Sequence, residues 1–212
     1  LWIPKDVSGL TFGNNGFYLD FEDSSNLGND VNGGTDLTAV SLAAADQATD
    51  TPSNNFCTMS PIASLDSPVM SEGNCFMTND GGSEHAVSTF AASSGRWYFE
   101  VKVTVQNSAN ALVAGISDVY MSQKELAEGW LGMDTGQYGY VGADGKIYHA
   151  DDGGTSHGDT ITTNDILGVY VDLEDNKLYF SKNGTLQNSG TGYSITAPAS
   201  TTGGAYHFCT GD

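Results

Sequence analysis

Apolar and polar residues alternate in several short runs along the second part of the chain. The clearest run is GRWYFEVKVTVQ, in which polar residues separate five apolar ones: Trp97, Phe99, Val101, Val103 and Val105. Successive side chains of a strand point to opposite faces of a sheet, so this run predicts a half-buried antiparallel strand. The next run, ANALVAGISDV, predicts a more fully buried strand, with Gly115 where a neighbouring backbone or a bulky side chain comes close.

Two further segments combine alternation with turn signals. In QYGYVGADGKIYH, the pair Asp144-Gly145 supplies the positive φ angles that a tight type I′ turn demands. In DILGVYVDLEDNKLYFSKNG, residues 174–176 make one turn and Asn183-Gly184 makes the next. The apolar residues of this segment share one face: Leu167, Val169, Val171, Leu173, Leu178 and Phe180. Since a sheet with one apolar face needs a second sheet over it, the chain is predicted to be all-β, an antiparallel β-sandwich.

The first part of the chain is turn-rich and polar, and it holds too little apolar material to fold alone. One short strand is expected at residues 16–21 and one helical turn at residues 43–48. We therefore predict a turn-rich extension, residues 1–61, that packs on a sandwich formed by residues 62–212. In the sandwich, SQKELAEGW has the best helical composition of the chain, but it is long enough for only one or two helical turns.

The order of these runs resembles the SPRY domain, a bent β-sandwich of concanavalin-like, jelly-roll topology. GRWYFEVKV is similar to the family's early strand GkwYfEv, LVAGISD to its vGia strand, and YGYVGADGKIYH to its ygy...G.ky hairpin. GDTITTNDILGVYVDLEDNKLYFSKNG resembles the signature GDvIGv.lDl..g.l.Ff.NG nearly position by position. The resemblance covers about residues 72–190. The family usually closes with a further strand, and this chain stops at AYHFCTGD, so that strand is expected to be missing or supplied by a partner chain.

The flanking segments VSGLTFGNNGFYLDFEDSSNLGND and LAAADQATDTPSNNFCTMSP resemble the region before SPRY-like domains in tail and fibre proteins of bacteriophages. This resemblance implies a virion component, assembled in the bacterial cytoplasm and working outside cells. It implies a non-enzymatic receptor-binding module whose partners are a host-surface glycan or protein and other virion chains, in a homo-oligomer. The alternative is a structural, self-assembling part of a fibre, tube or capsid decoration.

The charge of the chain narrows the range of partners. There are 26 acidic residues against 7 Lys and Arg, which gives a formal net charge of -19. Such a surface repels phosphate backbones and anionic lipids, so we expect no nucleic-acid partner. We also expect no membrane insertion, since no run approaches the ~20 apolar residues of a membrane span. Cys57, Cys75 and Cys209 are too widely spaced for a zinc site and are interpreted as buried, reduced residues, with one disulfide as the alternative.

The carboxylate and zinc patterns typical of hydrolases are absent from the sequence, and no enzyme is predicted. The chain has no E-x-D-x-E set of carboxylates and no H-E-x-x-H. The loop HADDGGTSHGD does collect three carboxylates, those of Asp151, Asp152 and Asp159, and hard cations prefer oxygen ligands. Because the spacing is not that of an EF-hand, we expect a solvated acidic loop without a cofactor, and keep a calcium site as the alternative.

Aromatic residues gather in the connections between residues 118 and 140. SPRY-like domains bind through loops gathered at one end of the sandwich, and the resemblance therefore implies a binding surface here. Tyr and Trp side chains provide a large contact area at a low entropic cost. The predicted ligand-binding residues are Tyr120, Trp130, Asp134, Tyr138 and Tyr140. The alternative is that half of these aromatic side chains fill the core, and for Trp130 the two interpretations are equally supported.

Overall fold

The structure is a computed structural model that describes residues 6–7, 9–47, 56–64, 68–78, 85–106, 112–118 and 130–211. The chain divides into two compact units. The first comprises Leu1–Cys57 and Met70–Phe76, and the second comprises Thr58–Val69 and Met77–Asp212. In the described ranges no helix is long and apolar enough to cross a membrane. The predicted helix at residues 122–130 falls almost entirely outside these ranges.

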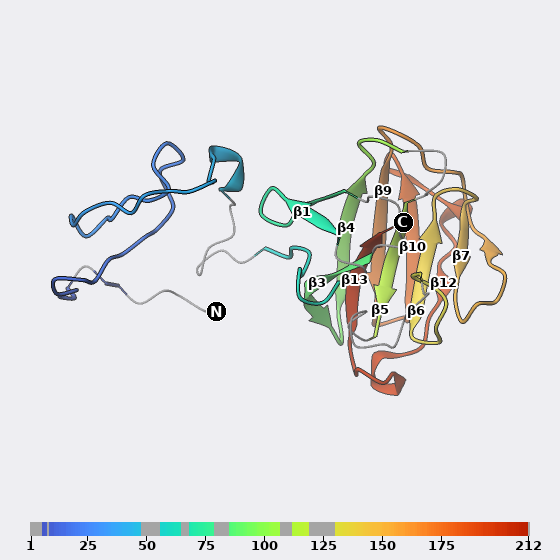
Figure 1. Cartoon of the computed structure of the whole chain (residues 1–212). Coiled ribbons are helices and arrows are strands. Elements are labelled where there is room, and N and C mark those ends of the chain that lie inside the picture. Colours follow the sequence, from blue (N-terminus) through green and yellow to red (C-terminus); the bar gives the residue numbers. More distant parts are fainter. Residues whose placement is uncertain are drawn as a thin grey trace. The chain divides into compact units, whose positions relative to one another are not determined.

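The second unit is built from two antiparallel sheets (Figure 1). The five-stranded sheet has the order β11-β10-β9-β4, with β12 also paired to β10, and its strands are β4 (Arg96–Lys102), β9 (Ile166–Asp172), β10 (Lys177–Lys182), β11 (Thr185–Leu186) and β12 (Tyr193–Ser194). The six-stranded sheet has the order β3-β13-β5-β6-β7-β8. Its strands are β3 (His85–Ala92), β5 (Val113–Ser117), β6 (Gln137–Val141), β7 (Lys146–Tyr148), β8 (Thr155–Ser156) and β13 (Tyr206–Gly211). The predicted antiparallel β-sandwich is confirmed.

The remaining elements are short. Strands β1 (Val69–Ser71) and β2 (Phe76–Thr78) form a separate two-stranded sheet. In the described residues, single turns of 3-10 helix lie at Ala44–Asp46, Asn188–Gly190 and Pro198–Ser200. The first of these is the helical turn that the sequence predicts.

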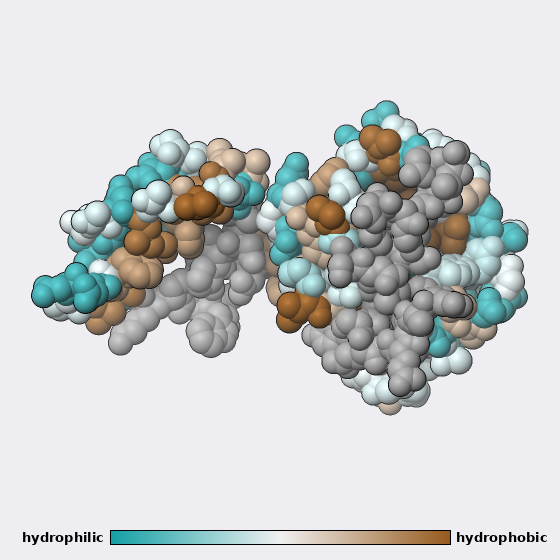
Figure 2. All heavy atoms as spheres, viewed as in Figure 1, coloured by the Kyte–Doolittle hydropathy of each residue, from teal (hydrophilic) through white to brown (hydrophobic). Residues whose placement is uncertain are grey.

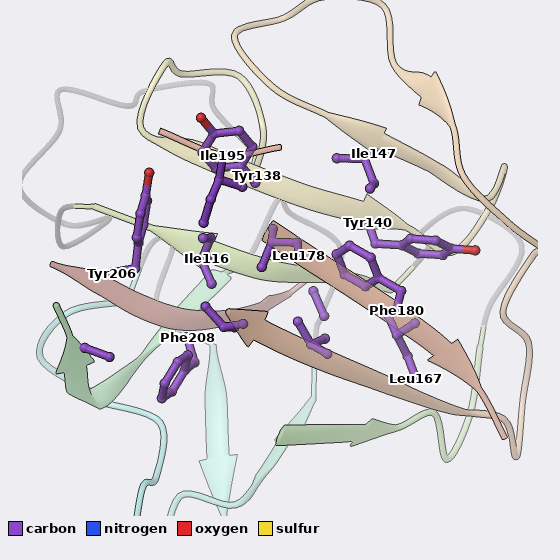
Figure 3. Close-up of a cluster of buried hydrophobic side chains, with 14 of the residues drawn as sticks. Ile116, Tyr138, Tyr140, Ile147, Leu167, Leu178, Phe180, Ile195, Tyr206 and Phe208 are labelled. Atoms are coloured by element: carbon purple, nitrogen blue, oxygen red, sulfur yellow. The ribbon is translucent and has the colours of Figure 1, made fainter. Parts of the chain in front are cut away.

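The main core lies between the two sheets and is rich in aromatic side chains (Figure 3). Alternate residues of β9 and β10 face it, and the whole predicted apolar face is buried there: Leu167, Val169, Val171, Leu173, Leu178 and Phe180. Tyr138, Tyr140 and Tyr206 fill the opposite side from the six-stranded sheet. Alternation with a period of two therefore identified this core face correctly.

The turns follow the predicted positions, but one has a different geometry. Lys182 pairs with Thr185, and both Asn183 and Gly184 have positive φ, which is the two-residue type I′ geometry. The turn predicted at Asp144-Gly145 is instead a four-residue connection, because Val141 pairs with Lys146. Only Gly145 of the predicted pair has a positive φ, so the prediction of a tight type I′ turn there is wrong.

Strand β4 alternates as predicted but is less buried than expected. It ends at Lys102, and Val105, predicted to lie on the buried face, is 81% exposed. Trp97, on the apolar face of the strand, is still 43% exposed. β4 is an edge strand of its sheet, so no neighbouring strand covers Trp97 from its outer side, and Val105 lies beyond the end of the strand.

The last residues of the chain form a central strand. A further strand after the segment AYHFCTGD was expected to be missing or supplied by a partner chain; the segment itself forms β13 (Tyr206–Gly211) between β3 and β5. Cys209 of β13 is buried, whereas Cys57 and Cys75 are exposed, and no disulfide joins any two of them. The interpretation of the cysteines as buried residues is therefore correct for Cys209 alone.

The first unit has little buried apolar surface in its described residues. Residues 16–21, predicted to be a strand, are not a strand, because their polar Asn/Gly/Asp surroundings favour turns. Phe17 and Phe21 are each 52% exposed, and hydrophobic side chains are visible on the surface of this unit (Figure 2). The packing of the extension on the sandwich stays a prediction.

A buried histidine makes the stability of the sandwich depend on pH. The ring of His157 packs against the rings of Tyr140, Phe180 and Tyr193, and its Nε2 atom is buried with no hydrogen-bond partner among the described residues. Burial lowers the pKa of His157 below the ordinary value of about 6.5. The folded protein therefore keeps this ring neutral at a pH at which the unfolded chain is already protonated.

We expect the free energy of unfolding to decrease as the pH is lowered from about 7.5 to about 5.5. The stabilisation is complete above the pKa of the unfolded chain and is lost as the pH falls toward the lower pKa of the folded protein. Urea unfolding across this range measures the decrease. The variant His157→Phe lacks the titrating group and should show a smaller decrease; His207, whose pKa burial also lowers, retains a part of it. Equal decreases in both proteins would contradict this assignment.

Candidate functional site

Several connections of the six-stranded sheet meet at one end, which we call the loop end: Asp118, residues 130–136, residues 149–154 and residues 195–205. Because neighbouring strands are antiparallel, the end of β5 lies beside the start of β6, the end of β7 and the start of β13. Hydrogen bonds join the connections directly. The amides of Ala150 and Asp151 donate to the carbonyls of Asp134 and Gly132, both at 3.3 Å.

Asp118 holds two parts of the loop end together. Its side chain is buried, and Oδ2 accepts a hydrogen bond from the amide of Thr202 at 3.0 Å. Its own amide donates to the carbonyl of Gly136 at 3.0 Å. A β-carbon on Gly136 would overlap the Asp118 carboxylate, so the close approach requires glycine at this position. Asp118 therefore positions both residues 130–136 and residues 195–205.

Residues 130–132 fold back over the outer face of the six-stranded sheet. Leu131 is fully buried there in a second, smaller hydrophobic cluster with Val87, Val113 and Cys209. The amide of Leu131 donates to Nε2 of the buried His85 at 3.3 Å, and the amide of Gly132 donates to Oε1 of Gln137 at 3.0 Å. These contacts fix the backbone of the connection next to Trp130.

Trp130 is half-buried and rests on a tyrosine of β7. Its ring meets the ring of Tyr148 edge-on, with centroids 4.8 Å apart. The Tyr148 hydroxyl donates to Oδ2 of Asp144 at 2.7 Å, and this hydrogen bond raises the pKa of Tyr148. In the part of the chain that the structure describes, the indole N–H of Trp130 has no hydrogen-bond partner. A half-exposed aromatic ring with a free donor is suited to contacting a ligand.

Two of the predicted binding residues lie in the core instead. Tyr138 stacks on His149 at 4.2 Å, and its hydroxyl accepts a hydrogen bond from the amide of Thr196 at 3.0 Å. The hydroxyl of Tyr140 donates to the carbonyl of Asp159 at 2.6 Å, and burial raises the pKa of Tyr140 to about 12. These contacts support the alternative interpretation, in which part of the aromatic set fills the sandwich.

Of the other predicted binding residues, the structure describes Asp134 and Trp130 but not Tyr120. Asp134 is half-buried, and its backbone carbonyl accepts hydrogen bonds from the amides of Gln137 and Ala150. Tyr120 lies outside the described residues. The structure therefore brings Trp130 and Asp134 to the loop end, while Tyr138 and Tyr140 lie beneath it.

The carboxylates of the acidic loop, for which a calcium site was the alternative, do not converge. Asp151, Asp152 and Asp159 are all exposed, and Oδ1 of Asp152 accepts a hydrogen bond from the amide of Gly154 at 2.9 Å. Among the described residues there is no group of three or more His, Cys, Asp or Glu side chains positioned to hold a metal ion. Asp151 and Asp152 are better placed to give the loop end an acidic rim.

Sequence reasoning missed the residues that support Trp130. Tyr148 was part of a predicted hairpin and was given no role in binding. No signal in the sequence connected Leu131 with His85, since 46 residues separate them and the contact arises only from the sheet order.

Comparison with known proteins agrees with the fold. The family model described as SPRY domain matches residues 96–201. Ran-binding protein 9 of Xenopus tropicalis is 33% identical over 107 residues, which are 50% of this chain and 19% of that protein. The Ran-binding proteins 9/10 homolog of Drosophila melanogaster is 29% identical over 106 residues, which are 50% of this chain and 11% of that protein. The chain thus spans less than a fifth of the length of these curated relatives.

A solved structure shows the same architecture. The crystal structure of the SPRY domain of human HERC1 superposes with a TM-score of 0.53 at 15% sequence identity, and covers 72% of this chain and 87% of that domain.

These relatives correct the predicted biological setting. The assignment to a phage virion is wrong, because the curated proteins similar to this chain include Ran-binding proteins of animals. The host-surface partners, the virion chains in a homo-oligomer, the self-assembling alternative and the virion or extracellular location are corrected with it. The error came from the flanking segments. Their Gly, Asn and Asp residues are required by turns in many unrelated proteins and therefore carry little information about origin.

Proposed function

Because the chain belongs to the SPRY domain family, we propose that it is a non-enzymatic module that binds another protein. The names of the animal relatives state that they bind a protein, Ran, and this chain matches a part of them. Binding through the loop end is the interpretation that the geometry supports best.

The observation that carries the proposal is the position of Trp130. Its half-exposed ring lies on Tyr148, and the neighbouring Leu131 anchors the backbone in the second hydrophobic cluster. Tryptophan and tyrosine are enriched among the residues that dominate binding energy at protein interfaces. A side chain held in place before binding loses little entropy when a partner docks. We call Trp130, Tyr148, Asp151 and Asp152 the Trp130 site.

The charge around Trp130 indicates which partners fit. Asp151 and Asp152 are exposed, and a hydrogen bond ties this loop to Gly132, two residues from Trp130. Asp152 also lies close enough to Tyr148 to raise the pKa of its hydroxyl, although less than Asp144 does. Acidic groups beside an aromatic anchor favour a partner that presents lysine or arginine, and they speed association at low salt.

Replacing Trp130 with alanine is expected to weaken binding at least about thirty-fold, because an aromatic anchor near the centre of an interface contributes about 2 kcal/mol or more. The first probe is purified Ran, and the second is a cell lysate passed over the immobilised wild-type chain and the variant. Isothermal titration or mass spectrometry of the retained proteins provides the measurement.

Leu186→Ala is the matched control, since Leu186 is an exposed apolar residue of the other sheet. It should bind as the wild type does. A Trp130→Ala variant that keeps its circular dichroism spectrum and retains every partner would contradict the proposed site.

A further inference from the structure

One edge of the sandwich differs from the others. On the six-stranded sheet, residues 58–60 run along β3: the amide of Ser60 donates to Val87 and the amide of Thr89 donates to Thr58, both at 2.8 Å. The strands β8, β11 and β12 at the other edges have two residues each. Strand β4 has seven residues, and no strand of the described chain pairs with its outer side.

The hydrogen-bonding groups on the open side of β4 follow from its register with β9. The amide of Leu173 donates to Gly95, and the amide of Val103 donates to Asp165, each at 3.0 Å. In an antiparallel pair, hydrogen-bonded and non-hydrogen-bonded positions alternate. The odd-numbered residues of β4 therefore bond to β9, and the N–H and C=O groups of the even-numbered residues point outward: Arg96, Tyr98, Glu100 and Lys102.

The side chains along this edge form an apolar row and a polar row. Trp97, Phe99 and Val101 point to the core side, where the rings of Trp97 and Phe99 lie 6.1 Å and 5.3 Å from the ring of Phe208. Trp97 is nevertheless 43% exposed. Tyr98, 47% exposed, packs against Tyr170 on the opposite side of the sheet. An added strand would therefore meet apolar side chains on one face and polar side chains on the other.

Some of the charged side chains of β4 already form ion pairs or hydrogen bonds within the chain. Arg96 forms ion pairs with Asp172 at 2.8 Å, Glu174 at 3.1 Å and Asp175 at 3.6 Å. Glu100 accepts a hydrogen bond from the Tyr98 hydroxyl. Lys102 is exposed, and no ion pair involves it among the described residues. An acidic residue on a partner strand is the complement of this cation.

We infer that β4 is a second binding surface, which receives an extended strand of a partner protein by β-strand addition. The outward N–H and C=O groups of Tyr98, Glu100 and Lys102 bond to the partner backbone. The partner strand has an apolar residue at every second position, and these residues lie over Trp97 and Val101. A carboxylate of the partner strand lies opposite Lys102. This surface belongs to the other sheet from the Trp130 site, so the inference does not depend on the proposed function. The competing interpretation is that the charged residues of β4 only prevent edge-to-edge association.

Hydrogen exchange in the free protein tests whether the edge is open. The amides of Tyr98, Glu100 and Lys102 should exchange quickly, whereas those of Trp97, Phe99 and Val101, bonded to β9, should be protected. Equal protection of the two sets would overturn the inference, because the outward groups would then already be paired.

A library of acetylated nine-residue peptides tests binding. The peptides alternate Val, Ile or Phe with Ser, Thr, Asp or Glu, and are screened against the full chain. Acidic members should bind with a dissociation constant below about 100 µM and should protect the three outward amides. If no member binds, or if binding protects the loop end instead, the inference is wrong.

Proline variants provide matched controls. Glu100→Pro removes an outward N–H without breaking a bond to β9, and should weaken peptide binding at least ten-fold. Ser156→Pro makes the same change on the outer side of the two-residue strand β8 and should leave binding unchanged. Lys102→Glu should selectively weaken the binding of acidic peptides, and it replaces Glu100→Pro as the test variant if Glu100→Pro does not fold. If Glu100→Pro folds and binds the peptides with unchanged affinity, the charged residues of β4 only prevent edge-to-edge association. If Glu100→Pro does not fold, unchanged affinity of Lys102→Glu for the acidic peptides leads to the same conclusion.

Discussion

Replacing Tyr140 with alanine is expected to lower the free energy of unfolding by about 3–5 kcal/mol, the usual cost of removing a buried aromatic ring. The ring is completely buried and lies 4.9 Å from the ring of Phe180, between the two sheets. The substitution leaves a cavity in a core that spans both sheets and deprives the Asp159 carbonyl of its hydrogen bond. Urea unfolding followed by tryptophan fluorescence measures the change.

The conservative variant separates packing from hydrogen bonding. Tyr140→Phe keeps the ring and removes only the hydroxyl that donates to Asp159, so it should cost about 1 kcal/mol. The sequence placed Tyr140 among ligand-binding residues. A Tyr140→Ala variant with wild-type stability and impaired partner binding would support that interpretation and contradict the structural role.

The second large effect is expected for Leu131→Ala, which should lower the free energy of unfolding by about 2–5 kcal/mol. Leu131 fills the second hydrophobic cluster, against Val87, Val113 and Cys209. Its removal also releases the backbone that positions Trp130, so partner binding should weaken although the variant retains the indole ring. Denaturant unfolding and a binding titration, both performed on this variant, test the two effects.

Thr135→Ala is the control for Leu131→Ala, because Thr135 belongs to the same connection and is exposed. It should change stability by less than about 0.5 kcal/mol. Should Leu131→Ala destabilise the protein while binding stays at the wild-type level, the link between the second cluster and Trp130 would be wrong.

The predicted strands were reliable where local chemistry decides the structure. In residues 165–184, alternation gave the buried face of β9 and β10, and Asn183-Gly184 forms the turn that such a pair favours. At residues 142–145 the same reasoning predicted the position of the turn but not its length. The pairing of Val141 with Lys146 depends on the register of β6 and β7 in the sheet, which the turn residues alone do not set.

The candidate site was predicted less well. Tyr138 and Tyr140 lie two residues apart and share a face of β6, which alternation reveals; that this face meets β10 rather than a ligand depends on the second sheet. Trp130 was undecided between core and surface, and its position follows from the anchoring of Leu131 by distant strands. The open edge of β4 is likewise a property of the strand order and not of its own seven residues.

The sequence by itself determined six strands of the sandwich (β4, β5, β6, β7, β9 and β10), most of the predicted turn positions, the main core face and the resemblance to the SPRY family. These depend on interactions between residues close in the chain, or on a pattern that any sandwich of this family must satisfy. The tertiary structure alone decided which aromatic side chains are buried, where Trp130 lies and which strand edge is left open. Those features depend on contacts between segments far apart in the chain, such as the contact of β3 with residues 130–132. Short-range sequence patterns contain no information about such contacts.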